Sequence, residues 1–210
     1  MSWVKIYLGR HQIRFHYLSI FLLLLIPPAS IWAQPQEENS NFWPVYRNNQ
    51  AGFRISYPPS WVVVQPKGRN VKFSVNPPDG PGNCNVLSRV NPEISDMSQD
   101  ELNRIIESLP QDQDGWAEYI GLPSSQVRII ESRIAKIIDI PALIGVIETN
   151  LESLEGKYLR KQIVVLTFTP GTIWSLNCGA SSFDADETRS RFNILKPSFN
   201  KILGSFMLLR

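Results

Sequence analysis

The sequence predicts an α+β sandwich built from antiparallel strands and a few helices. Runs in which apolar and polar residues alternate are joined by short turns, and strands joined in this way are antiparallel. Helical patterns occur at only a few places and stand apart from the runs of strands. This order is typical of α+β folds rather than of alternating α/β folds.

The first half of the domain opens with five short predicted strands. Residues 42–48 and 52–58 are expected to form a hairpin, because Asn48, Asn49 and Gly52 supply turn chemistry between them. The next three predicted strands are residues 61–66, 70–77 and 83–90. A helix is expected to follow, because Ser98 and Glu101 form a capping box. Its apolar stripe is Leu102, Ile105, Ile106 and Leu109, and it ends at Pro110.

The second half repeats this order with longer strands. Residues 114–121 are expected to add one or two helical turns before the strands at 126–137, 141–153, 157–169 and 172–180. Glu155 and Gly156 form the turn of a predicted hairpin. A last helix is expected from about Asp186 to Leu203, kinked or split at Pro197. The C-terminal residues are expected to form an edge strand or a packed tail.

The N-terminus has the pattern of a secretory signal. Residues 1–16 are basic, residues 17–26 are apolar, and Ala33 offers a small residue for cleavage. The apolar run is shorter than the roughly 20 residues of a spanning helix, so we expect no stable membrane span after cleavage. The expected organisation is a signal peptide at 1–33, a disordered leader at 34–42 and a single domain at 43–210. An uncleaved anchor is the alternative.

Cleavage would change both charge and chemistry. The chain has 21 basic and 19 acidic residues, and residues 1–33 hold three basic and no acidic ones, which leaves 18 against 19. A nearly neutral protein argues against nucleic acid as a partner. Both histidines, His11 and His16, lie in the leader. Ser-His-Asp and Cys-His catalysis are therefore excluded, and we expect neither a metal nor another cofactor.

The two cysteines are expected to form a structural disulfide. Cys84 lies at the start of one predicted strand and Cys178 at the end of another. If these strands are antiparallel neighbours, both side chains face one apolar layer with Val86 and Leu176. Export to an oxidising compartment favours the bond. Two free buried thiols are the alternative.

Few other residues suggest chemistry. Ser198 and Lys201 have Ser-x-x-Lys spacing but lie within a helical stripe. The acidic runs at 112–114 and 184–187 are expected to be turn and helix-start features. Several tryptophans could line a cleft, although a tryptophan on an alternating strand is usually in the core. Trp61 and Trp116 are expected to be partly exposed and, with Tyr119, are the candidate binding surface.

Both ends of the domain resemble PsbP-like domains of the PsbP/DcrB type. The opening segment is GFRISYPPSWVV and the closing segment is FNILKPSFNKILGSFML. The resemblance covers about residues 43 to 208 and implies an antiparallel β-sheet sandwiched between helices, an α/β/α arrangement. It also implies an accessory or assembly protein rather than an enzyme, since members include extrinsic photosystem subunits and bacterial envelope proteins.

Two departures favour an envelope role over a photosynthetic one: the chain lacks a basic surface with metal-binding histidines, and its two cysteines are not general to such domains. We expect a periplasmic or secreted, non-catalytic module that acts through a protein or small-ligand surface. Its partner would be an envelope protein or a small ligand held between the sheet and residues 114–125. The alternative is an exported hydrolase using paired carboxylates or Ser198 and Lys201.

Overall fold

The structure is a computed structural model that describes residues 42–137 and 139–209. The predicted signal peptide and all but the last residue of the predicted leader lie outside the described residues. The strands are β1 (Val45–Asn48), β2 (Phe53–Ser56), β3 (Val62–Val63), β4 (Val71–Asn76), β5 (Asn83–Val90), β6 (Val127–Ile137), β7 (Ile140–Ser153), β8 (Gly156–Thr169), β9 (Thr172–Ser182) and β10 (Met207–Leu208). The helices are α1 (Gln99–Ser108), α2 (Gln113–Ile120) and α3 (Ala185–Gly204), with short 3-10 turns at Pro92–Ile94 and Ser124–Gln126.

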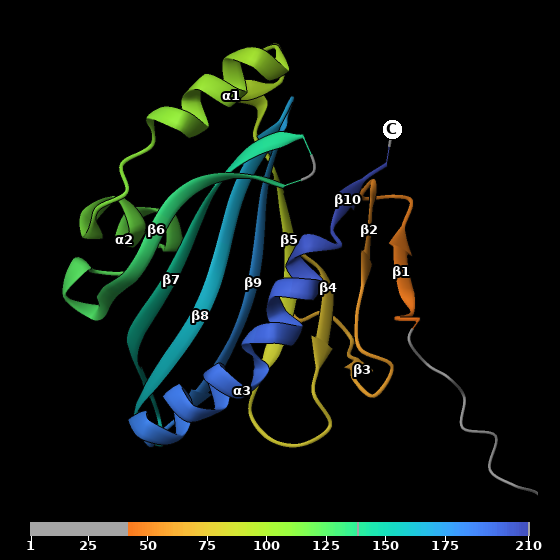
Figure 1. Ribbon diagram of the computed structural model, residues 1–210. Helices are drawn as coiled ribbons and strands as arrows, with labels where there is room; N and C mark the ends of the chain where they lie inside the picture. The colour runs from red at the N-terminus through yellow and green to blue at the C-terminus, as the bar shows by residue number, and fades with distance from the viewer. Residues whose placement is uncertain (1–41, 138, 210) are drawn as a thin grey trace, which may run out of the picture. The chain divides into compact units, whose positions relative to one another are not determined.

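Two antiparallel sheets carry the fold (Figure 1). The larger has seven strands in the order β3-β4-β5-β9-β8-β7-β6, and each neighbouring pair is antiparallel. The smaller has the order β1-β2-β10. The predicted N-terminal hairpin is therefore confirmed, and the C-terminal residues form an edge strand on β2.

Helices cover both faces of the seven-stranded sheet. The run Ile163, Val164 and Val165 in β8 is buried on both sides because successive side chains point to opposite faces. Ile163 and Val165 belong to the apolar core that contains the residues of α3. Val164 belongs to the separate core that contains Trp116 of α2. The predicted α+β fold, with a sheet sandwiched between helices, is confirmed.

The core beneath α3 is rich in aromatic side chains. Phe192 and Phe199 of α3 are fully buried there, and Phe53 of β2 packs edge-on against Trp174 of β9 with ring centroids 6.0 Å apart. Trp61 joins the same core, where its ring meets that of Phe199 at 6.0 Å and a near-perpendicular angle. The small sheet and α3 therefore cover one side of the large sheet.

The last helix runs through Pro197 without a break, so the predicted split is wrong. Proline lacks an N–H and leaves the carbonyl of residue 193 without its helical donor. Asn193 and Pro197 both lie on the exposed side of α3, where water can satisfy that carbonyl. The predicted helix start is confirmed, because the Asp184 side chain caps α3.

The predicted disulfide is confirmed, since the structure joins Cys84 to Cys178 across a separation of 94 residues. The two residues are direct partners in the β5–β9 ladder. Both are buried in the core beneath α3, as the alternation of the two strands requires.

Candidate functional site

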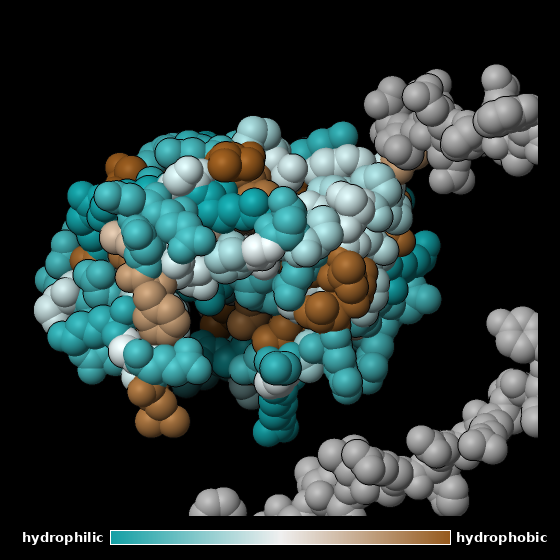
Figure 2. Space-filling view, turned by 90° about the horizontal axis from the view of Figure 1, so that it is seen from below, coloured by the Kyte–Doolittle hydropathy of each residue, from teal (hydrophilic) through white to brown (hydrophobic). Residues whose placement is uncertain are grey.

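One half of the second face of the large sheet is left open. Helices α1 and α2 lie over β6, β7 and part of β8, and β5 and β9 extend beyond them (Figure 1). A pocket of about 440 Å³ lies beside α2 on this face. Figure 2 shows a hollow that is brown in its depth and bordered by teal side chains. An apolar floor with a polar border is typical of small-ligand sites.

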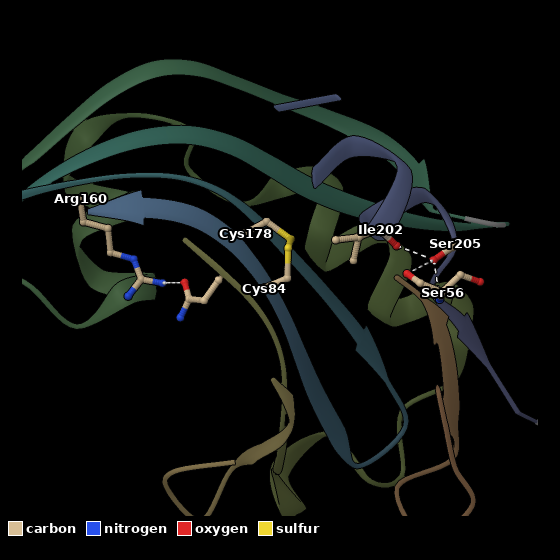
Figure 3. The surroundings of a disulfide bond; sticks show 7 residues. Ser56, Cys84, Arg160, Cys178, Ile202 and Ser205 are labelled. Carbon is tan, nitrogen blue, oxygen red and sulfur yellow. Dashed lines mark hydrogen bonds between the residues drawn. A yellow bond between two sulfur atoms is a disulfide. The ribbon is translucent and has the colours of Figure 1, made fainter. Parts of the chain in front are cut away.

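The polar part of the pocket is built around Arg160 of β8. Its guanidinium donates a hydrogen bond of 3.3 Å to the side-chain oxygen of Asn83 in β5, two strands away (Figure 3). Thr149 of β7 is the direct cross-strand partner of Arg160, so both side chains point to the pocket face. Gln162, two residues further along β8, lines the same part of the pocket.

A glycine allows two strands to pack closely beside the Arg160–Asn83 hydrogen bond. Strand β9 lies between β8 and β5, and the β9 residue in register with Asn83 is Gly179. A Cβ atom at Gly179 would approach the Cβ of Gln162 to 2.6 Å. The missing side chain therefore lets β8 lie close to β9 at Gln162, beside the Arg160–Asn83 hydrogen bond.

The apolar part of the pocket comes from the sheet and from α2. Leu87 of β5, Val164 of β8 and Ile173 of β9 line it from the sheet side. Trp116, Tyr119, Ile120 and Leu122 line it from α2 and the turn that follows. The cleft expected between the sheet and residues 114–125 is therefore present.

Helix α2 is held in place by Trp116. The Asp112 side chain caps the start of the helix, and Gly121 ends it in the left-handed conformation that favours glycine. The indole lies directly on Gly145 of β7, where an added Cβ would come to 2.4 Å from the ring. The indole N–H donates to the hydroxyl of Ser132 at 2.9 Å. These contacts fix the wall of the pocket on the sheet.

The charged side chains that line the pocket are all basic. Among the described residues that line it, two are arginines, Arg89 and Arg160, and none is Asp or Glu. Burial lowers the pKa of the Arg160 guanidinium, because desolvation disfavours its charge. At the rim, burial raises the pKa of Tyr119, helped by the charges of Glu118 and Asp112. The raised pKa keeps the phenol of Tyr119 neutral near neutral pH. The guanidinium of Arg160 is charged at the same pH, because the ordinary pKa of arginine lies far above it.

The disulfide stiffens the floor of the pocket from the opposite face. Cys178 stands between Asn177 and Gly179 in β9, and Cys84 stands between Asn83 and Asn85 in β5. Asn83 and Asn177 carry pocket-side groups, whereas the sulfur atoms point into the core beneath α3 (Figure 3). The covalent bond therefore joins the two strands that form the open half of the site.

The expected exposure of the tryptophans is wrong. Trp61 is 7% exposed and lies on the opposite side of the sheet, because its ring fills a gap against Phe199. Trp116 is 0% exposed, because Gly145 lets its ring sink onto the sheet. The structure therefore does not bring the three candidate residues together. Trp116 and Tyr119 share the pocket wall, with ring centroids 5.9 Å apart, and Trp61 does not.

The residues considered for hydrolysis do not form a reactive pair. Lys201 places its ammonium 4.2 Å from the centre of the Trp43 ring, and no hydrogen bond joins it to Ser198 within residues 42–137 and 139–209. In the same part of the chain, no three His, Cys, Asp or Glu side chains gather as metal ligands. Asp184 caps α3, as expected for a helix-start feature, whereas Asp112, expected in a turn after the helix that begins at Ser98, caps α2.

Sequence reasoning missed the most buried charge, Glu148 of β7. This carboxylate is 3% exposed and pairs with Arg128 at 2.8 Å and with Arg189 at 3.2 Å. Burial raises its pKa, but the hydrogen bonds from Arg189 and Arg128 outweigh burial, so its pKa lies below the ordinary value. Because its cations satisfy it fully, we interpret the cluster as structural, joining β6 and β7 to α3.

The sequence also gave no direct sign of Arg160 and Thr149 as a pair. They lie 11 residues apart, and only the register of the β7–β8 hairpin makes them neighbours. The available signals were the glycines within strands, Gly145 and Gly179, because a strand glycine often marks a close approach. Within the described part of the chain, no helix is long and apolar enough to cross a membrane.

Known proteins resemble this chain only at the level of the fold. No family model matches the sequence, and no curated protein matches it. Among solved structures, CyanoP, the cyanobacterial PsbP of Synechocystis sp. PCC 6803, is 12% identical with a TM-score of 0.50, over 79% of this chain and 91% of its own. The Ran-binding protein Mog1p of Saccharomyces cerevisiae is 8% identical with a TM-score of 0.49, over 80% and 96% of the two chains.

A third solved structure is LpqN of Mycobacterium tuberculosis, described as involved in cell envelope biogenesis. It is 14% identical with a TM-score of 0.41, over 80% of this chain and 90% of its own. At such identities a likeness shows the fold alone. The likeness to CyanoP identifies that fold as PsbP-like, as the two ends of the domain predict.

Proposed function

We propose that this PsbP-like domain is an exported, non-catalytic binding module that holds a small ligand in the pocket beside α2. The observation that carries the proposal is the pocket itself, about 440 Å³, on the one face of the sheet that the helices leave half open. Its size and its mixture of apolar walls with a few polar groups are those of small-molecule sites.

The lining chemistry supports binding rather than catalysis. The polar side chains of the pocket are amides, hydroxyls and guanidinium groups, which hold ligands but do not exchange protons readily near neutral pH. The sequence after residue 33 has no histidine, and its two cysteines form the disulfide. General acid–base catalysis works best with a group whose pKa lies near the working pH, and the described residues that line the pocket include no His, Asp, Glu, Lys or Cys.

A neutral fluorescent probe, N-phenylnaphthylamine, tests this function. Its emission rises in apolar sites, so we expect saturable binding to the full chain, purified in oxidised form. Ser175→Phe fills the floor of the pocket and should abolish the saturable signal, whereas Ser60→Phe, at an exposed turn on the other side, should keep it. Leu87→Trp, from the neighbouring strand, provides a second blocking variant. Equal binding by all four proteins, each folded as judged by thermal unfolding, would overturn the proposal.

A protein-docking role is the second candidate, and a separate surface favours it. Leu154 at the β7–β8 turn is fully exposed, and Phe183 beyond β9 is more than half exposed against the ring of Tyr158. Exposed apolar side chains at one end of a sheet are typical of partner contacts. Photo-crosslinkers at positions 154 and 183 in intact cells would recover one specific envelope protein under this reading and no specific product otherwise.

A further inference from the structure

Arg160 differs from Arg128, Arg189 and Arg191 because it lacks an acidic partner. Arg128 and Arg189 both pair with Glu148, and Arg191 pairs with Asp79. Within the described residues, no carboxylate pairs with Arg160, which donates only to the neutral amide oxygen of Asn83. A desolvated guanidinium with a neutral acceptor retains unused donors that a bound anion can satisfy.

The residue opposite Arg160 is also incompletely bonded. Thr149 is 1% exposed, and its hydroxyl has no hydrogen-bond partner among the described residues. Buried hydroxyl groups usually have a hydrogen-bond partner, so an unpaired hydroxyl beside a pocket indicates a position where a ligand could bond. Because Thr149 and Arg160 are cross-strand partners on one face, a single acceptor placed between them can bond both.

The rest of the pocket lining reinforces the positive charge. Gln162 adds an amide on the side of Arg160, and Arg89 of β5 lies on the opposite side of the pocket. With no Asp or Glu among the described lining residues, an anion entering the pocket meets no charge of its own sign. Low-dielectric walls strengthen such a field at the floor of the pocket.

The lining changes from polar to apolar along β8. Arg160 and Gln162 are followed on the same face by Val164 and Leu166, and the four positions span about 20 Å at the usual rise of a strand. Leu87 and Ile173 extend the apolar part onto β5 and β9, where Ser175 lies between Leu87 and Leu166 and Asn177 lies beside Val164. Along β8 the pocket therefore matches a molecule with one charged end and a longer apolar body.

We propose that the pocket binds an amphipathic anion whose single acidic head group, a carboxylate or phosphate monoester, is held by Arg160 and Thr149. The apolar body of the ligand lies over Val164, Leu87 and Ile173 towards the wall formed by α2. Both head groups present paired oxygens that a guanidinium binds in bidentate fashion. This inference rests on the proposed function and names the ligand class of the same pocket.

Displacement of N-phenylnaphthylamine by three ten-carbon compounds tests the inference. Decanoate and decyl phosphate carry the anionic head groups, and decanol supplies the same chain without charge. We expect both anions to displace the probe from the full chain at concentrations about tenfold or more below that of decanol, because a charged hydrogen bond adds at least that factor. A difference between the two anions would identify the source of the head group.

Two pocket variants and one control separate the head-group contacts from general packing. Arg160→Met keeps the apolar stem of the side chain. It should remove the preference for the two anions over decanol and leave the concentration at which decanol displaces the probe unchanged. Thr149→Val keeps the shape of the side chain, and it should weaken the binding of decanoate and decyl phosphate a few-fold. Arg47→Met, an exposed arginine of the small sheet, should behave as the wild type. If Arg160→Met fails to fold, Thr149→Val and the wild-type head-group preference decide the question.

The outcomes separate the inference from the function on which it rests. If the probe binds and Ser175→Phe blocks it, but decanol competes as well as decanoate and Arg160→Met changes nothing, the anion site is refuted and the binding function stands. If the probe never binds saturably, or Ser175→Phe binds it unchanged, the function itself fails.

Discussion

At the scale of single residues, two strand glycines, Gly145 and Gly179, allow close packing at the pocket. The Trp116 ring packs on Gly145, and Gly179 lets Gln162 of β8 lie close to β9. Both positions have ordinary strand neighbours, so they are occupied by glycine for space and not for turn formation. Their close contacts lead to a direct test.

Gly145→Ala is expected to destabilise the domain by about 1–3 kcal/mol, because an extra methyl group is forced into a packed site. Its Cβ would lie 2.4 Å from Cζ2 of Trp116, so the indole must shift and the tryptophan emission should move to the red. Gly204→Ala is the matched control, since an added Cβ there meets nothing within 4 Å. Urea unfolding followed by fluorescence measures both, and equal stability of the two variants would contradict this packing.

Glu148 gives the stability a specific pH dependence. Its pKa in the folded state lies below the ordinary value, since the arginine hydrogen bonds outweigh burial. A carboxyl group with a lowered folded pKa contributes stability above its unfolded pKa of about 4.3 and loses it as the pH falls through the folded value. Its contribution should therefore be full at pH 6 and should diminish below about pH 4.

Glu148→Gln tests this dependence. We expect the variant to be about 1–3 kcal/mol less stable than the wild type at pH 6, and this gap should shrink as the pH falls to about 3. Glu152→Gln, which removes an exposed carboxylate paired with Lys157, should show little effect at either pH. Urea denaturation curves at pH 6 and pH 3 measure the free energies of unfolding. A difference between wild type and Glu148→Gln that is the same at both pH values would contradict the role of Glu148 as a paired, ionised carboxylate.

At the scale of elements, the sequence predicted the strands and their pairing better than the placement of the helices. The disulfide was predicted on the condition that β5 and β9 are antiparallel neighbours, and the structure meets this condition, since Cys84 and Cys178 are direct partners. The helix that carries Trp116 was expected. The packing of the Trp116 ring on Gly145 was not, because that contact depends on the relative positions of α2, β6 and β7.

The outcome for Pro197 has the same cause. A proline within a helical pattern predicts a kink or a split, but α3 continues through Pro197 as one helix, and six buried side chains along it pack against the sheet. Its C-terminal end is also tied to β2, where the Ser56 amide donates to the Ser205 hydroxyl at 2.8 Å (Figure 3). Tertiary packing therefore outweighs the local propensity.

The disulfide is expected to act mainly on the two strands that it joins. Replacing both Cys84 and Cys178 with alanine should lower the free energy of unfolding by about 2–4 kcal/mol, as for other long loops. Hydrogen exchange should accelerate most in β5 and β9 and least in the β6–β7 pair. Acceleration spread evenly over all strands would show that the bond does not specifically support the pocket floor.

At the scale of the whole molecule, export is the expectation that connects the oxidised cysteines to the absence of histidine after residue 33. The protein from its native host should have an N-terminus near Gln34 and a mass two hydrogens below that of the reduced chain. Intact-mass spectrometry with and without reductant measures both properties. A native protein that begins at Met1 and carries two thiols open to alkylation would contradict export.

The function could be predicted from the sequence only as a class. The resemblance at the two ends indicated the fold, and the lack of histidine after residue 33 led to the expectation of binding rather than catalysis, which stays a prediction. The candidate site was predicted in part: the cleft beside residues 114–125 is present, with Trp116 and Tyr119 in its wall. Arg160, Thr149 and Gly179 come from three different strands, and only the sheet register brings them to one face.

The central claim is that ligands enter the half-open face of the large sheet and not the face beneath α3. Amide chemical shifts in a two-dimensional NMR spectrum, recorded while decanoate is added, test it residue by residue. We expect the changes to cluster at the pocket residues of β5, β8, β9 and α2, with Gly179 and Arg160 among the largest. Changes confined to α3 and the small sheet, or no saturable change at all, would contradict the account.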